Sequence, residues 1–241
     1  MYAWRGLVGL VKPTYRAGSL ERFIRLMPDG VVVIPRYVGV RTGSEKEFQE
    51  ALSVAEEKVA ELADLKVDLV VIQGVPPIML RGYAFDAELV ENLERKHCVA
   101  VLTATRTQVE ALQALKICRL VGLTYFKDDL NPKFASFFEE AGFEVAAMKG
   151  CSTEMPFSDL GKIPAEEIYA QAKKVFVETG GGDCLYLLGA GWDCLPAIEP
   201  LERDLRTVVV TNVTADVWAT QKYLRIRAPV AGYGRLLAEM P

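Results

Sequence analysis

Side chains that can bind anions or move protons gather directly after short apolar runs. The run at residues 6–11 is followed by Lys12, Thr14, Tyr15 and Arg16, and the run at 99–103 by Thr105 and Arg106. The planar guanidinium of arginine matches a carboxylate with two parallel hydrogen bonds. A strand-to-helix turn near Thr105 would add free N–H groups. These positions are candidate anchors for a small carboxylate or dicarboxylate.

Two more polar residues are candidates for the site, and the tyrosine among them could donate a hydrogen bond or a proton. Tyr125 follows the run at 119–124, and Asp193 follows Gly189-Ala190-Gly191-Trp192. Each candidate also has a structural interpretation. The arginines could be solvated surface charges, and Tyr125 could be a core tyrosine with its hydroxyl at the surface. Asp193 could be the N-cap of a helix over 194–205.

The cysteines give no metal-binding pattern. They are Cys98, Cys118, Cys151, Cys184 and Cys194. No pair has CxxC spacing, and His97 is the single histidine. We therefore expect no metal site, and most of these thiols should be small buried hydrophobic groups.

Composition excludes several classes of protein. The chain has 241 residues, is 51% hydrophobic and has a net charge of −4, with no basic stripe for nucleic acid. Its most apolar stretch, 67–80, is interrupted by Asp68, Gln73, Pro76 and Pro77, which argues against a membrane span. The N-terminus lacks a secretory signal pattern, so we expect a cytoplasmic protein.

Short apolar runs alternate with helical patterns along the whole chain. Strands are predicted at 6–11, 31–35, 67–73, 99–103, 119–124, 143–148, 184–188 and 207–212. Their continuous apolar character is typical of parallel strands buried on both faces. Ser44 and Glu47 predict a capping box at a helix start. The stretch 150–163 is predicted to be a lid or an active-site loop. The fold class is therefore α/β.

A repeated sequence pattern, called the Asp-to-Gly echo below, suggests that the chain consists of two similar halves. Asp68 and Gly74 frame one predicted strand, and Asp183 and Gly189 frame another with the same spacing. Two facing βαβ halves would place the two glycines across one cleft, at the carboxyl ends of strands where ligands bind. Chance similarity between two buried strands is the alternative.

Five motifs in order resemble the aspartate/glutamate racemase superfamily, in its arylmalonate decarboxylase and maleate isomerase branch. They are Gly9–Thr14, Gly74 with Arg81–Phe85, Thr124–Asn131, Val217-Trp218 and Gly232–Leu236. The resemblance covers nearly the whole chain. It implies a single compact unit of two pseudo-twofold halves with parallel sheets, about 1–110 plus the C-terminal segment and about 111–215. It also implies cofactor-independent chemistry and a homodimer.

The resemblance also places the family's catalytic positions on this chain. Racemases of the family use two facing cysteines, and the decarboxylase uses one; these positions fall on Gly74 and Gly189. The decarboxylase's hydroxyl donors fall on Val75 and Pro76, and the catalytic tyrosine falls on Phe126, one residue after Tyr125. The predicted ligand-binding set is Thr14, Arg16, Gly74, Val75, Pro76, Thr105, Arg106, Phe126, Gly189 and Ala190, with Tyr125 as the catalytic candidate.

Three functions fit these residues. The first is an enzyme that acts on a small carboxylic acid, as a decarboxylase or another lyase, without a catalytic thiol. The second is a cysteine-dependent racemase or isomerase with a displaced thiol, Cys151 or Cys194. The third is a non-catalytic carboxylate-binding protein that retained the fold.

Overall fold

The computed structural model describes residues 2–126, 128–151, 155–189 and 191–241, and in these residues eight strands form two parallel sheets. The strand orders are β2-β1-β3-β4 and β6-β5-β7-β8. The strands are β1 (Gly6–Lys12), β2 (Val31–Tyr37), β3 (Leu69–Ile72), β4 (Val101–Thr103), β5 (Arg119–Thr124), β6 (Glu144–Gly150), β7 (Cys184–Leu188) and β8 (Val208–Thr211). The predicted α/β class and all eight strands are confirmed.

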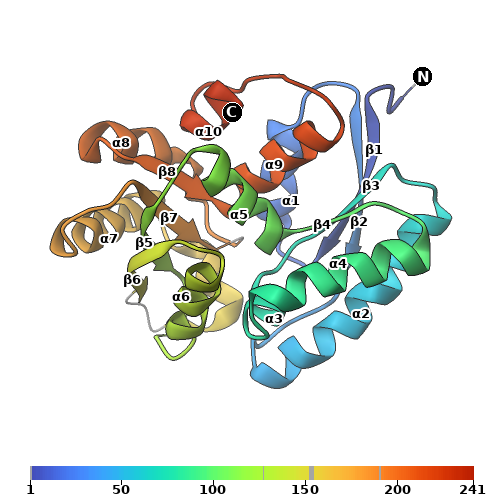
Figure 1. Ribbon diagram of the computed structural model, residues 1–241, viewed down its shortest axis with the longest axis horizontal. Coiled ribbons are helices and arrows are strands. Elements are labelled where there is room, and N and C mark those ends of the chain that lie inside the picture. The colour runs from blue at the N-terminus through green and yellow to red at the C-terminus, as the bar shows by residue number, and fades with distance from the viewer. Residues whose placement is uncertain (1, 127, 152–154, 190) are drawn as a thin grey trace.

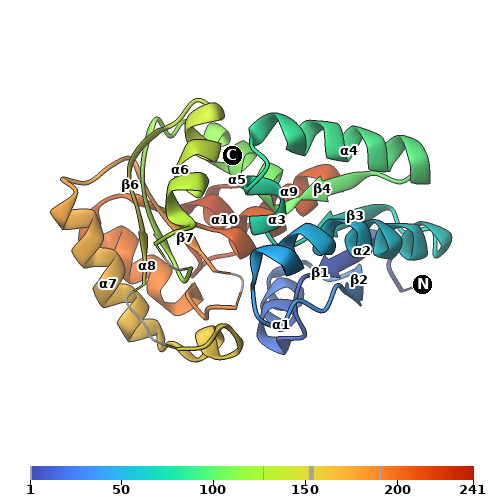
Figure 2. The same ribbon diagram turned by 90° about the horizontal axis from the view of Figure 1, so that it is seen from below.

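Helices connect the strands, as parallel neighbours require. They are α1 (Ala17–Leu26), α2 (Glu45–Asp64), α3 (Pro76–Met79), α4 (Tyr83–His97), α5 (Ala104–Ala114), α6 (Asn131–Glu140), η1 (Phe157–Lys162), α7 (Ala165–Glu178), α8 (Leu195–Leu205), α9 (Asn212–Tyr223) and α10 (Arg235–Glu239). Helices α2 and α4 contact the first sheet, and α6, α7 and α8 contact the second (Figures 1 and 2). No helix among the described residues is long and apolar enough to cross a membrane.

The start of α2 is only partly as predicted. The Ser44 hydroxyl accepts a hydrogen bond from the Glu47 N–H at 3.3 Å, so Ser44 is the N-cap. The Glu47 carboxylate instead accepts from the N–H groups of Thr42 and Gly43, both at 2.8 Å. The predicted reciprocal bond to Ser44 is therefore wrong, because Glu47 organises the preceding loop.

The echoed aspartates have the same structural role in both sheets. The Asp68 carboxylate accepts from the Leu7 N–H at 2.8 Å, at the start of β1. The Asp183 carboxylate accepts from the Arg119 N–H at 2.9 Å, at the start of β5. Each aspartate satisfies an otherwise unpaired amide where a central strand begins. This common role gives the echo a physical reason.

A second repeated contact joins helix to strand. Glu94 on α4 accepts from the Val101 N–H at 2.9 Å, and Glu202 on α8 accepts from the Val209 N–H at 3.0 Å. The two pairs hold equivalent positions at the starts of β4 and β8. Together with the repeated strand order, they support the proposal that the chain is one unit of two pseudo-symmetric halves.

Helices α5 and α9 join the halves. Each follows the last strand of one sheet and contacts the other half: α5 contacts β8, and α9 contacts β3. Both lie in the middle of the molecule in Figure 1. One hydrophobic cluster includes buried side chains from both sheets and both helices, such as Leu10, Leu112, Leu187 and Val217. The halves are therefore packed on a shared core.

A buried acid lies where α5, α9 and β3 meet. Asp216 on α9 accepts hydrogen bonds from the Thr107 hydroxyl at 2.7 Å and from the Gln73 amide at 3.1 Å. Asp216 is fully buried. Burial raises the pKa of Asp216 to about 7, although the two donors act to lower it. The carboxyl group therefore loses its proton within the neutral range.

We expect Asp216→Asn to flatten the pH dependence of folding stability. A folded pKa above the ordinary 3.8 means that the folded protein binds this proton more tightly than the unfolded chain. The resulting contribution is present in full below about pH 4 and is lost as the pH rises through 7. Urea melts measure the free energy of unfolding from pH 4 to 8. This free energy should fall by roughly 2–4 kcal/mol less in Asp216→Asn than in wild type over that range.

The exposed Asp29→Asn is the control and should retain the wild-type profile. If the profiles of Asp216→Asn and wild type coincide, Asp216 does not titrate in this range.

Candidate active site

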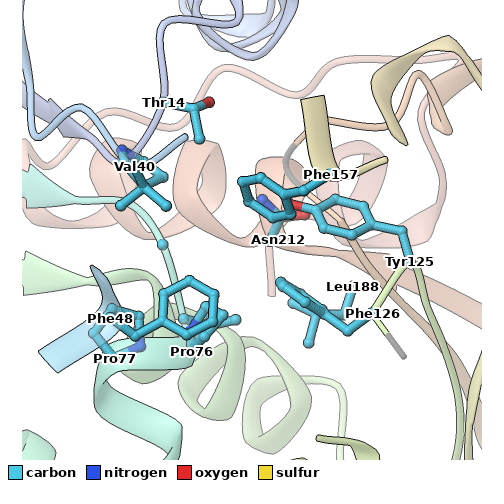
Figure 3. Close-up of a pocket in the computed structure, with 13 residues that line it drawn as sticks. Thr14, Val40, Phe48, Pro76, Pro77, Tyr125, Phe126, Phe157, Leu188 and Asn212 are labelled. Carbon is cyan, nitrogen blue, oxygen red and sulfur yellow. The ribbon is translucent and has the colours of Figure 1, made fainter. Parts of the chain in front are cut away.

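A pocket lies at the carboxyl ends of the strands, between the two halves. Its lining consists of Pro13, Thr14, Val40, Phe48, Gly74, Val75, Pro76, Pro77, Tyr125, Phe126, Phe157, Leu188 and Asn212. Figure 3 shows Phe48, Pro76 and Pro77 from the first half opposite Phe126 and Leu188 from the second. Three side chains of the lining are polar, those of Thr14, Tyr125 and Asn212. The chamber is therefore mainly apolar.

Most predicted site residues gather at this pocket. Thr14, Gly74, Val75, Pro76, Tyr125 and Phe126 line it. Gly189 directly follows the lining residue Leu188 and is buried against Tyr125. The prediction for Ala190 falls outside the described residues.

The structure does not bring Thr105 and Arg106 to the pocket. The Thr105 side chain is fully buried and donates to the Thr103 hydroxyl at 3.0 Å. The Arg106 side chain is 47% exposed and pairs with Glu110 at 2.9 Å. Arg106 is therefore a solvated surface charge and not a ligand anchor. Its guanidinium lies on the outer side of α5, paired with Glu110 one turn away.

Gly74 adopts a backbone conformation that other residues rarely take. Its φ is +101°, and a Cβ atom added there would lie 3.0 Å from Cβ and Cγ of Pro13. The strain and the close approach both disfavour a side chain. The first loop can therefore pack directly on this point of the backbone.

Gly189 lacks space for a side chain for a different reason. An added Cβ atom would lie 2.8 Å from Cε1 of Tyr125, with Cδ1 of the same ring closer still, and 3.0 Å from Cδ2 of Trp192. Real Cβ atoms essentially never approach other atoms so closely. The Tyr125 ring thus occupies the space in which a side chain at position 189 would lie.

Aromatic neighbours fix the Tyr125 ring. Its centroid lies 4.5 Å from that of Phe126, 5.6 Å from that of Trp192 and 6.4 Å from that of Phe157. Tilted and edge-on contacts of this kind stabilise a ring beyond the area that it buries. Tyr125 therefore has one well-defined orientation in the pocket wall.

The neighbours of the Tyr125 hydroxyl affect how readily it gives up its proton. Burial raises the pKa of Tyr125, while the Arg16 guanidinium and the Gly191 N–H, both hydrogen-bonding neighbours, act to lower it. Burial is the largest effect, so the hydroxyl remains protonated at neutral pH. After proton release, the guanidinium and the N–H would stabilise the phenolate. The group can thus donate a proton or a hydrogen bond.

Arg16 lies beside the pocket rather than in its lining. Its guanidinium carbon is 4.5 Å from the centroid of the Phe157 ring and 5.8 Å from that of Tyr125. Nη2 of Arg16 donates to the Phe157 carbonyl. Arg16 therefore connects the first loop to η1, which carries Phe157 over the pocket.

Positive charge accumulates behind this loop. Lys12 is fully buried, and its amine donates to the Ser19 hydroxyl. Burial, followed by the positive charges of Arg22 and Arg16, lowers the pKa of Lys12 to about 8. Asp193 lies 3.6 Å from Arg22 and does not cap α8, whose N-cap is Cys194. The N-cap interpretation of Asp193 is therefore wrong, because its carboxylate joins the loop before α8 to α1.

None of the five cysteines lines the pocket. Cys151, Cys184 and Cys194 are buried. Burial raises the pKa of Cys151 to about 11 and that of Cys194 to about 12, and it also raises the pKa of Cys184. A neutral buried thiol is a poor nucleophile and a slow base. No group of three or more potential metal-binding side chains occurs in the described part of the chain.

Seven lining residues were not among the predicted site residues: Pro13, Val40, Phe48, Pro77, Phe157, Leu188 and Asn212. Asn212 ends a predicted strand and opens a helix, which is the location where parallel sheets bind ligands, so this signal was available. Phe48 was visible only as part of the apolar face of α2. Phe157 reaches the pocket through a loop, and its position cannot be derived from periodicity.

Comparison with known proteins places the chain in a family. The family model for arylmalonate decarboxylase matches residues 8–237. The arylmalonate decarboxylase of Bordetella bronchiseptica is 23% identical over 235 residues, covering 96% of each chain. A maleate isomerase of Pseudomonas putida is 25% identical over 201 residues, covering 80% of this chain and 79% of its own.

Solved structures give the same fold. The maleate isomerase of Pseudomonas putida S16 superposes with a TM-score of 0.89 at 17% identity, covering 98% of this chain and 99% of its own. Unliganded arylmalonate decarboxylase superposes with a TM-score of 0.83 at 21% identity, covering 97% and 99%. At these identities the likeness establishes the fold.

We expect only Cys98 and Cys118 to react quickly with a thiol reagent in the native protein, because these two thiols are exposed. Titration with dithionitrobenzoate should release about two equivalents from the native protein and five after denaturation, with mass spectrometry locating the labels. Rapid native labelling of Cys151 or Cys194 would contradict this prediction and revive a displaced catalytic thiol.

We also expect Gly189→Ala to destabilise the fold, by about 1–3 kcal/mol, because the new methyl group overlaps the Tyr125 ring. Tyr125→Leu in the same chain should recover part of this loss, since the smaller side chain leaves space. A double-mutant cycle in urea measures the coupling. Additive effects of the two substitutions would show that they do not compete for one volume.

Proposed function

Because the chain belongs to the arylmalonate decarboxylase family, we propose that it is an enzyme acting on a small carboxylic acid, by decarboxylation or another lyase step without a catalytic thiol. The observation that carries this proposal is the position of Tyr125. Its ring fills the space next to Gly189, and its hydroxyl is the acidic group of the pocket lining.

In this proposal Gly74 and Gly189 stand at the two cysteine positions of the superfamily. The strained φ of Gly74 and the crowding at Gly189 both disfavour side chains there. The buried thiols elsewhere have raised pKa values. These facts favour thiol-free chemistry over a displaced cysteine.

Arg16 binds the carboxylate that the substrate keeps. Its guanidinium already contacts Tyr125 and Phe157 at the edge of the pocket. In an apolar chamber this charge is poorly screened, so an ion pair contributes more than in water. The departing carboxylate would lie against Val75, Pro76 and Phe126, where an ionised group is poorly solvated.

Tyr125 then completes the reaction. The bond between the α-carbon and the departing carboxylate breaks and releases CO2, and the electron pair stays on the α-carbon as an enediolate. The Tyr125 hydroxyl gives its proton to that carbon. Arg16 and the Gly191 N–H stabilise the resulting phenolate, which recovers a proton from solvent.

One observation favours a second function. Val75 and Pro76 provide no side-chain donor for the enediolate, and Pro76 also lacks a backbone N–H. A missing oxyanion donor typically costs about 10²–10³ in rate. A carboxylate-binding protein without turnover is therefore the second candidate, and arylmalonates, maleate, aspartate and glutamate should be poor substrates. A cytoplasmic homodimer remains a proposal from the family resemblance.

We expect Tyr125→Phe to lower kcat by about 10²–10⁴ with little change in KM, because it removes the proton donor and keeps the ring. Arg16→Ala should mainly raise KM. The assay is CO2 release from a panel of alkyl-substituted malonates, each of which keeps one carboxylate for Arg16 after CO2 leaves. Arg95→Ala, whose side chain is 70% exposed, is the control for loss of an arginine.

Unchanged kcat in Tyr125→Phe would remove this residue from the chemistry. Binding of the panel without CO2 release in wild type would favour the second candidate.

A further inference from the structure

Asn212 brings a polar group into the pocket that the fold itself does not use. It is the first residue of α9, is 3% exposed and lines the pocket. Figure 3 shows its side chain near the middle of the lining, reaching it from α9. The amide thus belongs to the wall that faces a ligand.

The start of α9 does not require this amide. Thr211 is the N-cap, and its hydroxyl accepts from the Thr214 N–H at 3.2 Å, while the Thr214 hydroxyl accepts from the Thr211 N–H at 3.1 Å. In the other half, Thr103 caps α5 by accepting a hydrogen bond from the Arg106 N–H at 3.2 Å, and the residue after it is Ala104. An alanine therefore suffices at this position for the helix to form.

The carbonyl oxygen of the amide is left without a partner. Oδ1 of Asn212 is buried and accepts no hydrogen bond within the described residues. An unsatisfied buried acceptor is costly and rare in folded proteins. Because the residue lines the pocket, a ligand is the natural source of the missing donor.

We propose that the Asn212 carbonyl accepts a hydrogen bond from a hydroxyl or amino group of the ligand. The substrate class is then a carboxylic acid with a hydroxyl or amino substituent near the carboxyl group and an apolar remainder that fits the chamber. This rests on the proposed function, in which Arg16 holds the carboxylate. A carboxylate alone cannot satisfy Oδ1, because it carries no donor at neutral pH.

The test compares ligands that differ in one donor. Calorimetry measures the affinity of mandelate, 2-fluoro-2-phenylacetate and phenylacetate for wild type, Asn212→Ala and Asn212→Leu. Fluorine has nearly the size of a hydroxyl group but donates no hydrogen bond. The matched control is Gln113→Ala, which removes an exposed amide on α5, and thermal melts check that each variant folds.

We expect wild type and Gln113→Ala to bind mandelate about tenfold more tightly than the fluoro analogue, as one buried hydrogen bond implies. Both Asn212 variants should lose this preference and bind the fluoro analogue as wild type does. Equal affinity of wild type for mandelate and the fluoro analogue would overturn the proposal. Equal weakening of all three ligands in Asn212→Ala would also overturn it, because the amide nitrogen would then bind the carboxylate that the three ligands share. Failure of wild type to bind any of the three ligands would overturn it as well.

Failure of the proposed function has a different signature. If Arg16→Ala binds all three ligands as wild type does, the carboxylate anchor is wrong while the preference for mandelate can still stand. If Arg16→Ala weakens the binding of all three ligands, but wild type does not prefer mandelate to the fluoro analogue, only the Asn212 proposal fails.

Discussion

The contact between α5 and α9 determines where the pocket can form. Each helix starts at the carboxyl end of one sheet and packs on the opposite half. Asp216, Thr107 and Gln73 join at this contact, and Gln73 directly precedes Gly74. Because the network is buried, breaking either hydrogen bond to Asp216 would leave further polar groups unpaired, which restricts sliding of the halves. The ends of β3 and β7 are thereby held on the two sides of one apolar chamber.

Within that chamber, the Tyr125 ring and a side chain at position 189 cannot both be accommodated. The Tyr125 ring lies where a side chain at position 189 would have to lie. Aromatic contacts with Phe126 and Trp192 make a rotation of the ring costly. The glycine and the tyrosine are thus one structural unit, and a change at either position has to be judged with the other. Arg16 extends this unit, because it contacts Tyr125 and also binds the Phe157 carbonyl.

The eight strands could be predicted from the sequence because buried parallel strands are continuous apolar runs, and such runs are visible in a short stretch of sequence. The Asp-to-Gly echo was informative because Asp68 and Asp183 satisfy the same kind of strand amide. Thr14, Val75 and Pro76 were predicted correctly as pocket residues because they follow predicted strands, and ligands bind at the carboxyl ends of parallel strands. Their family positions added to this signal.

The remaining differences arise from side-chain direction and from contacts distant in sequence. Arg106 was proposed from its place near a strand end, but its partner Glu110 holds it on the outer face of α5. The crowding between Tyr125 and Gly189 joins residues 64 positions apart, so no local pattern contains it. Phe157 depends on the path of a loop. Asn212, in contrast, could have been predicted, because it lies where a predicted strand ends and a helix begins.

The central claim is that this family member works without a thiol. The most direct measurement is CO2 release from the alkylmalonate panel by a chain whose five cysteines are all replaced by alanine or serine, with folding checked by circular dichroism. We predict turnover within a few-fold of wild type. Loss of turnover in this folded cysteine-free protein, with recovery when one cysteine is restored, would contradict it.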